Sequence, residues 1–189
     1  MDLRVATDAK WVDLVLNNID RFIIDHAQTK RKSAHAAMSM LTYYPDKQNL
    51  VKSMLTFSVE ELQYFQRVMH LMHQRDLTLL PDEQTPYINL LCQHLRPQHD
   101  EYFLDQLLIT SIIEARSHER FSLIAAALGE GDLKDFYQSI AQEEAHHSSL
   151  FANLALHYFS HEAVTIRRAQ LFTAEAELIK NLPIKACVH

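Results

Sequence analysis

Glycine and proline are scarce in this sequence, which has two glycines and five prolines among 189 residues. Folds rich in β-sheet need many more turn residues at this length, because glycine and proline build the tight turns between strands. A β-sandwich, a barrel and a doubly wound sheet are therefore excluded. We expect a chain that is almost entirely helical.

Cysteines and long apolar runs are also few. Two cysteines, Cys92 and Cys187, cannot make a disulfide framework or a zinc–thiolate site, and isolated thiols suit a reducing compartment. No run approaches the roughly 20 apolar residues that a membrane span requires. The first ten residues carry four charged side chains where a signal peptide has an apolar segment. We expect a cytoplasmic protein with no membrane partner.

The chain does contain enough apolar mass for one sizeable core, since 48% of its residues are hydrophobic and 22% are charged. We therefore expect a single domain over residues 1–189. The net charge of −6 argues against generic phosphate binding. The twelve histidines are a high count for a residue whose special uses are metal ligation and proton transfer.

Apolar residues recur at intervals of three and four in five segments, which predicts helices over about 8–44, 46–73, 100–128, 132–159 and 160–183. The proline-containing stretch 76–97 predicts a long crossover with at most one short helix, at about 87–95. Two helix pairs joined by a long crossover are the connectivity of ferritin-like proteins. The predicted fold class is all-α, a ferritin-like four-helix bundle with a long crossover and extra flanking helices.

Each of the four long predicted helices carries a polar group inside its apolar stripe near mid-length. These groups are Lys30, Glu61, Glu114, and Glu144 with His147. A carboxylate that faces a core is costly unless a cation meets it. Helical bundles hold metals with a Glu from some helices and a Glu-x-x-His pair from others, because residues three apart share a helix face.

The Glu-x-x-His spacing alone is a weak signal, because twelve Glu and twelve His in 189 residues give about 0.8 such pairs by chance. A solvated helix face is the alternative interpretation of this segment. The apolar stripe decides between them: Ile140, Glu144, His147 and Phe151 fall on one side of the helix. Glu144 and His147 are therefore predicted to face the core.

Three inward carboxylates predict a compensating cation, and a metal ion supplies it compactly. The candidate metal ligands are Glu61, Glu114, Glu144 and His147. The alternative is a set of buried salt bridges from the three glutamates to Arg116 or Arg120.

Several segments resemble one known family. Residues 113–121 read Ile-Glu-Ala-Arg-Ser-His-Glu-Arg-Phe, close to the family motif Ile-Glu-Ala-Arg-Ser-x-Glu-Arg-Phe, and Glu144-x-x-His147 follows at the family distance. Residues 25–34 are similar to Asp-His-x-x-x-Glu-x-Lys-Ala-Ala, residues 60–62 to the start of Glu-Glu-Leu-x-His, and residues 168–178 to the closing helix. Over nearly its whole length, the chain thus resembles the tRNA 2-methylthio-N6-isopentenyladenosine hydroxylases, the MiaE family.

The resemblance implies a non-haem di-iron site in a ferritin-like fold. Such a site uses dioxygen and an electron donor to hydroxylate the isopentenyl group of a modified adenosine beside the tRNA anticodon, so tRNA is the implied partner. This sequence differs from the family at two implied ligands. Lys30 occupies the position of a family Glu and Tyr64 that of a family His, and the resemblance implies that both family residues bind the same iron. The other iron keeps Glu114, Glu144 and His147, with Glu61 as a fourth group.

The balance of charges then predicts that the Lys30 ammonium replaces one of the two metal ions. Four carboxylates balance two ferrous ions, whereas Glu61, Glu114 and Glu144 balance one ferrous ion and the Lys30 ammonium. Our hypothesis is a mononuclear iron or manganese site, with Lys30 paired to Glu61 and Glu144. Two irons per chain is the alternative.

Lys30 and Tyr64 are the candidate catalytic residues beside the ligands. Tyr64 is a weak ligand, a redox-active phenol or an aromatic core residue. His118, one turn after Glu114, is either an additional ligand or a hydrogen-bonded core histidine. The sequence does not decide between these roles.

Two classes of function follow. The first is a tRNA hydroxylase. The second is a ferritin-like bundle that has lost turnover, or an oxidase of a different small substrate. Candidate phosphate contacts are Lys30, Arg31, Lys32, Arg116, Arg120, Arg167 and Arg168, although a solvated face also explains Arg31, Lys32 and Arg167. Neither the RNA-binding residues nor the oligomeric state is predicted.

Overall fold

The computed structural model describes residues 3–81 and 85–189, and these residues form seven α-helices. Within the two described ranges there is no β-strand, so the predicted all-α class is confirmed. In the same part of the chain, no helix is both long enough and apolar enough to span a membrane.

The helices are α1 (Ala9–Leu16), α2 (Ile19–Tyr43), α3 (Gln48–Gln74), α4 (Pro86–Cys92), α5 (His99–Ala127), α6 (Asp132–Tyr158) and α7 (His161–Asn181). They fall into two compact units. The described residues of the α5–α6 unit are 3–13, 85–184 and 189, and those of the α2–α3 unit are 14–81 and 185–188. That residues 1–189 form a single domain stays a prediction.

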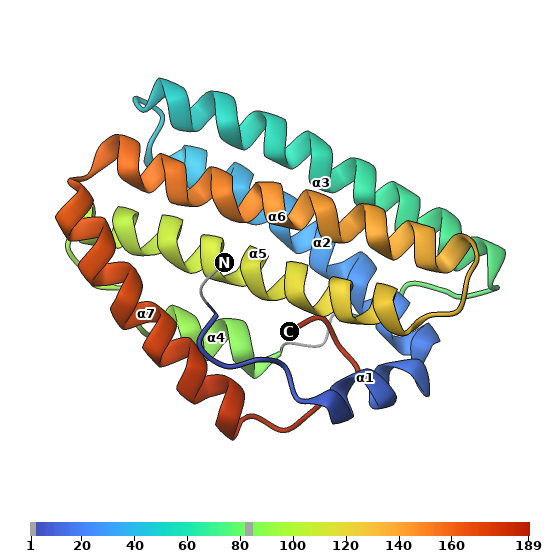
Figure 1. Cartoon of the computed structure of the whole chain (residues 1–189). Helices are drawn as coiled ribbons and strands as arrows, with labels where there is room; N and C mark the ends of the chain where they lie inside the picture. The colour runs from blue at the N-terminus through green and yellow to red at the C-terminus, as the bar shows by residue number, and fades with distance from the viewer. Residues whose placement is uncertain (1–2, 82–84) are drawn as a thin grey trace. The chain divides into compact units, whose positions relative to one another are not determined.

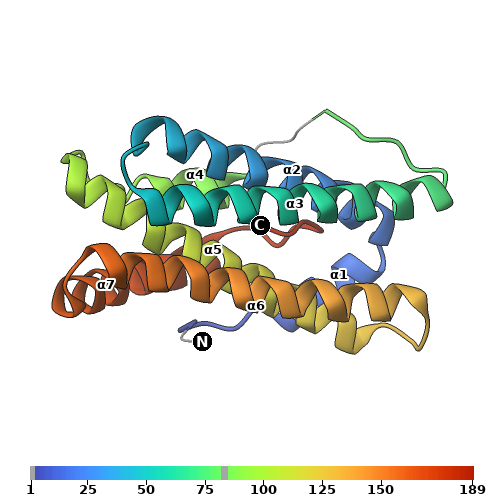
Figure 2. The same cartoon turned by 90° about the horizontal axis from the view of Figure 1, so that it is seen from above.

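The α2–α3 unit is built on an antiparallel helix hairpin, whose two helices lie side by side (Figure 2). α2 ends just before Tyr44, because Pro45 disfavours the helical conformation in the residue that precedes it. On α3, Leu50, Met54 and Phe57 are buried at helical spacing. Their apolar area supplies the main stabilisation of this hairpin, about 2 kcal/mol for each side chain.

The periodicity over residues 8–44 predicts one helix, and this prediction is wrong, because α1 ends at Leu16 and α2 begins at Ile19. The Asn18 side-chain amide donates to the Leu14 carbonyl oxygen at 2.8 Å, and its backbone N–H bonds to the Val15 carbonyl. Asparagine interrupts helices through such local hydrogen bonds. The apolar stripe crosses the break, because Val15 and Phe22 are both fully buried.

The α5–α6 unit contains a second helix hairpin, whose two helices run alongside each other (Figure 1). Gly131 lies in the turn between them with φ +143°, a backbone conformation that side-chain-bearing residues rarely adopt. Asp132 and Asp135 then occupy the first turn of α6, where carboxylates interact favourably with the exposed N–H groups of a helix start.

α7 packs against α4 and α5 around a buried polar cluster. Arg116 on α5 places its Nε 2.8 Å from Oε1 of Glu175, and Tyr87 on α4 donates its hydroxyl to the same oxygen at 3.1 Å. Burial raises the pKa of the Tyr87 hydroxyl, so it remains a donor. At the start of α7, Ser160 accepts a hydrogen bond from the Ala163 N–H, as a capping residue does.

Candidate metal centre

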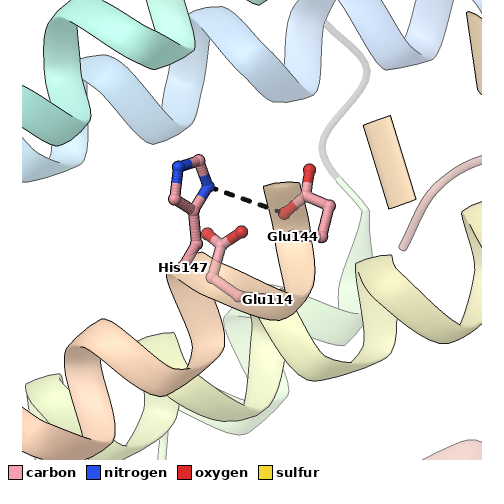
Figure 3. A group of neighbouring side chains, drawn as sticks. All are labelled: Glu114, Glu144 and His147. Atoms are coloured by element: carbon pink, nitrogen blue, oxygen red, sulfur yellow. Dashed lines mark ion pairs between the residues drawn. The ribbon is translucent and has the colours of Figure 1, made fainter. Parts of the chain in front are cut away.

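Three side chains of the α5–α6 hairpin point toward one another (Figure 3). Glu114 comes from α5, and Glu144 and His147 come from α6, where they are three residues apart and therefore share a face. Each side chain offers one ligand atom, and these atoms all lie within 4.8 Å of one another. The sequence pattern predicted these three residues as metal ligands together with Glu61, and the hairpin brings the three together. Glu61 belongs to the α2–α3 unit, and its place as a fourth ligand stays a prediction.

The group is closed off from solvent. Glu114 is 3% exposed, Glu144 1% and His147 0%. His147 Nδ1 lies 4.0 Å from Oε2 of Glu144, so the imidazole nitrogen and the carboxylate face the same point. Two carboxylates taken out of water at close range repel each other, and a cation between them offsets both their repulsion and their lost hydration.

A pair of reciprocal hydrogen bonds fixes the register of α5 against α6 beside this group. Ser111 Oγ donates to the Ser148 carbonyl oxygen at 2.8 Å, and Ser148 Oγ donates to the Ser111 carbonyl oxygen at 3.0 Å. Ser111 lies one turn before Glu114, and Ser148 directly follows His147. The two serines therefore hold the ligand-bearing turns together at backbone level.

His118 lies one turn beyond Glu114 on the other side of the group. Its Nδ1 is 2.6 Å from the Ala141 carbonyl oxygen, so Nδ1 carries the proton and donates it. Among the described residues, the group that could hold a metal comprises Glu114, Glu144 and His147 and does not include His118. This contact is compatible with both roles considered for His118, because a histidine that binds a metal through Nε2 also donates its Nδ1–H to such a carbonyl. His118 as an additional ligand stays a prediction.

The chemistry of this donor set fits a first-row divalent metal. Carboxylate oxygens with an imidazole nitrogen suit Fe²⁺ and Mn²⁺, which accept both kinds of ligand. Metal–ligand bonds of about 2.0–2.2 Å put opposite ligand atoms about 4 Å apart. Ligand atoms within 4.8 Å of one another thus need only small side-chain movements to meet one ion.

The α2–α3 unit contains a second buried ionic group. Lys30 Nζ lies 2.8 Å from Oε1 of Glu61, and their side chains are 2% and 0% exposed. The predicted pairing of Lys30 with Glu61 is therefore confirmed, and the predicted pairing of Lys30 with Glu144 stays a prediction. The same ammonium lies 5.3 Å from the ring centroid of Tyr64, and the Arg67 guanidinium carbon is also 5.3 Å from that centroid.

The arginines proposed as alternative counter-ions have other contacts. Arg116 pairs with Glu175 and Glu119. The Arg120 guanidinium carbon lies 5.1 Å from the ring centroid of Trp11. The motif at residues 113–121 thus includes two arginines, Arg116 and Arg120, that connect α5 to α7 and to α1.

Sequence reasoning missed three contributors to this unit, Ser111, Ser148 and Glu175. Ser111 lies one turn before Glu114 and is buried, and a serine at such a position is a signal that a buried partner is needed. Its partner Ser148 has no such signal in the sequence. The pairing of Glu175 with Arg116 depends on tertiary structure.

Comparison with known proteins places these features in a family context. The family model described as tRNA-(MS[2]IO[6]A)-hydroxylase (MiaE) matches residues 2–189. A Pseudomonas putida protein named tRNA 2-(methylsulfanyl)-N(6)-isopentenyladenosine(37) hydroxylase is 31% identical over 180 residues, which are 95% of this chain and 87% of that protein. A Salmonella typhimurium protein of the same name is 32% identical over 130 residues, which are 69% of this chain and 47% of that protein.

A solved structure shares the fold. It is Protein 43 with aldehyde deformylating oxygenase activity from Synechococcus, and its TM-score is 0.95 at 28% sequence identity. The match covers 100% of this chain and 96% of that one. The fold is therefore ferritin-like, as the helix pattern predicted.

Proposed function

Because the chain belongs to the tRNA-(MS[2]IO[6]A)-hydroxylase (MiaE) family, we propose that it is a non-haem iron oxygenase that hydroxylates the isopentenyl group of a modified adenosine in tRNA. The observation that carries this proposal is the buried group of Glu114, Glu144 and His147, whose ligand atoms lie within 4.8 Å of one another. A tRNA substrate implies the cytoplasm as the site of action.

Glu114, Glu144 and His147 would hold the metal. An iron bound there would activate dioxygen for the reaction, and manganese is the alternative metal. The two carboxylates balance the charge of one divalent ion. Their burial keeps water from competing for the ligand atoms.

The overall reaction needs electrons from outside the chain. Hydroxylation places one oxygen atom of dioxygen into a C–H bond and releases the other as water, which consumes two electrons and two protons. A bound metal would be regenerated in each turnover and would therefore supply neither electron to the overall balance. A separate electron donor is therefore part of the proposal.

We propose that Lys30 keeps a second metal away from Glu61. Its ammonium already lies 2.8 Å from that carboxylate in a buried position. Two positive charges at one carboxylate repel each other strongly in such surroundings. The chain would then bind one metal, and its activity would depend on that single site.

The contacts of Tyr64 support a packing role. Its ring lies against the Lys30 ammonium, and the ring is 9% exposed. Cations prefer the face of an aromatic ring, so Tyr64 helps to hold Lys30 in place. The alternative, that the Tyr64 phenol takes part in the oxidation, is tested by Tyr64→Phe, which keeps the ring and removes the hydroxyl.

The test is hydroxylation of tRNA that carries the prenylated adenosine. The protein is loaded with ferrous iron and incubated with the tRNA, dioxygen and a reductant. The tRNA is then digested to nucleosides, which are separated by chromatography and identified by mass spectrometry. We expect an added oxygen atom with wild type and with Glu143→Gln, whose residue is not among the three proposed ligands. Glu144→Gln should abolish it.

The outcomes separate the competing functions. Iron binding without any added oxygen, under conditions in which a relative from this family is active, would favour a bundle that has lost turnover. Hydroxylation of a different small substrate but not of tRNA would favour an oxidase. Either result would overturn the proposal.

A further inference from the structure

A groove lies between the last turns of α6 and the first half of α7. It encloses about 270 Å³, and its lining comes from α6, α7 and the N-terminal segment of the α5–α6 unit. Leu156, in its wall, follows His147 by nine positions on α6, which is about 180° around the helix and about 14 Å along it. The groove is therefore separate from the metal centre.

The lining combines basic side chains with apolar ones. Arg4, Arg168 and His161 contribute the basic side chains, and Leu156, Val164 and Phe172 contribute apolar ones. Among the described residues that line the groove, none is acidic. This composition stands out in a chain whose net charge is −6.

Both arginines are held at the groove by neighbouring side chains. The Arg168 guanidinium carbon lies 5.1 Å from the ring centroid of Phe172, and Arg4 Nη1 donates to the hydroxyl of Thr173. A guanidinium presents five N–H donors in a planar fork that matches phosphate oxygens. Arginines that are already oriented lose less side-chain entropy when they bind an anion.

Other basic residues considered as phosphate contacts are placed differently. Arg116 is fully buried and paired with Glu175. Arg167 donates from Nε to Asp105 at 2.7 Å. Lys30 belongs to the buried pair with Glu61. Arg168 differs from these three because it lines an open groove.

We propose that this groove binds a phosphate group of the RNA substrate between Arg4 and Arg168, with the attached ribose against the apolar side chains of the lining. The inference rests on the proposed function, in which the substrate is a tRNA much larger than the nucleotide that reacts. A contact remote from the reacting group positions the substrate by adding binding energy away from the chemistry.

The experiment compares tRNA binding by wild type and by Arg4→Ala/Arg168→Ala over a range of salt concentrations. A phosphate contact adds about 0.7–0.9 to the slope of log K against log salt. We expect the double variant to bind about tenfold more weakly near 0.1 M salt, with the slope reduced by about 1. Arg4→Lys/Arg168→Lys keeps both charges, so its slope should stay near that of wild type.

The matched control is Lys134→Ala/Lys180→Ala, which removes two positive charges from the same unit at lysines paired with Glu130 and Glu177. It should leave both affinity and slope nearly unchanged. Equal losses in the control and the groove variant would overturn the inference, because they would show a general charge effect. Unchanged binding by the groove variant would overturn it as well.

Hydroxylation of tRNA by wild type, measured in parallel, distinguishes the two proposals. If wild type hydroxylates tRNA and the groove variant binds it normally, the groove inference fails and the proposed function stands. If wild type neither binds nor hydroxylates tRNA, both fail.

Discussion

The ammonium nitrogen of Lys30 lies 2.8 Å from Oε1 of Glu61, and the structure buries both side chains. Both charges have lost most of their hydration, so each depends on the other. Breaking such a pair by removing one partner costs about 3–5 kcal/mol, because the remaining charge is left buried without compensation. This pair occurs where the family resemblance implies a metal ligand in place of Lys30.

Removing the lysine charge should destabilise the protein strongly. We expect Lys30→Met to lower the free energy of unfolding by about 3–5 kcal/mol, because it leaves the Glu61 carboxylate buried. Lys30→Met/Glu61→Gln removes both charges and should recover much of the loss. Urea unfolding measures these values, with Lys32→Met as the control at a partly exposed lysine. Equal effects for Lys30→Met and Lys32→Met would contradict the pairing as a source of stability.

Restoring the family ligands should restore a second metal. Lys30→Glu/Tyr64→His replaces the ammonium by a carboxylate and adds an imidazole three residues from Glu61. The added negative charge and the lost positive charge both favour a second divalent ion. Iron content after anaerobic loading should rise from about one to about two per chain. No increase in a folded variant would show that Lys30 is not what excludes the second metal.

The reciprocal serine bonds should affect both stability and metal affinity. Ser111→Ala/Ser148→Ala removes two buried hydrogen bonds, at about 1 kcal/mol each, and loosens the turns that carry the proposed ligands. We expect weaker metal binding by about tenfold, as for groups that orient ligands. The control is Ser149→Ala, because the Ser149 hydroxyl is exposed and donates to the carbonyl of Ala145 within α6. A double variant that loses stability but keeps full metal affinity would limit the serines to a structural role.

The Glu114, Glu144 and His147 group could be predicted because a helix stripe reports which side chains face inward. Two residues at Glu-x-x-His spacing inside an apolar stripe carry their orientation in the sequence itself. The partner of Arg116 could not be predicted in this way. Periodicity shows that a side chain is inward, but the choice between Glu175 and another carboxylate depends on how α7 packs on α5.

The break at Asn18 was missed for a related reason. Val15 and Phe22 continue one apolar stripe through it, so the periodicity looks like that of one helix. The local signal, two consecutive asparagines at 17 and 18, is weaker than the stripe. In the structure, the side-chain amide of Asn18 donates to the Leu14 carbonyl oxygen at the break, and this local bond accompanies the change in backbone conformation.

Asp105 should make stability depend on acidic pH. Burial alone would raise the pKa of this carboxyl, but hydrogen bonds from Arg96 and Arg167 lower the pKa below its ordinary value. A group whose pKa is lower in the folded state stabilises the fold above its unfolded pKa, about 4, and loses that contribution as pH falls through the folded pKa.

Asp105→Asn should therefore lower the free energy of unfolding by about 2 kcal/mol near neutral pH, less than for a fully buried pair because Arg96 is partly exposed. The gap to wild type should stay constant above about pH 5 and shrink below about pH 4. Urea unfolding over a pH series measures it, with Asp100→Asn as the exposed control. A gap that does not change with pH would contradict the assignment.

The central claim is that Glu114, Glu144 and His147 hold one metal ion per chain. The most direct test is to load the protein with ferrous iron, remove the unbound iron, and measure the iron content per chain by elemental mass spectrometry. We predict about one iron per chain for wild type and for His146→Gln, whose residue is exposed, and almost none for His147→Gln, whose residue is buried. Two tightly bound irons in wild type, or full iron content in His147→Gln, would contradict the account.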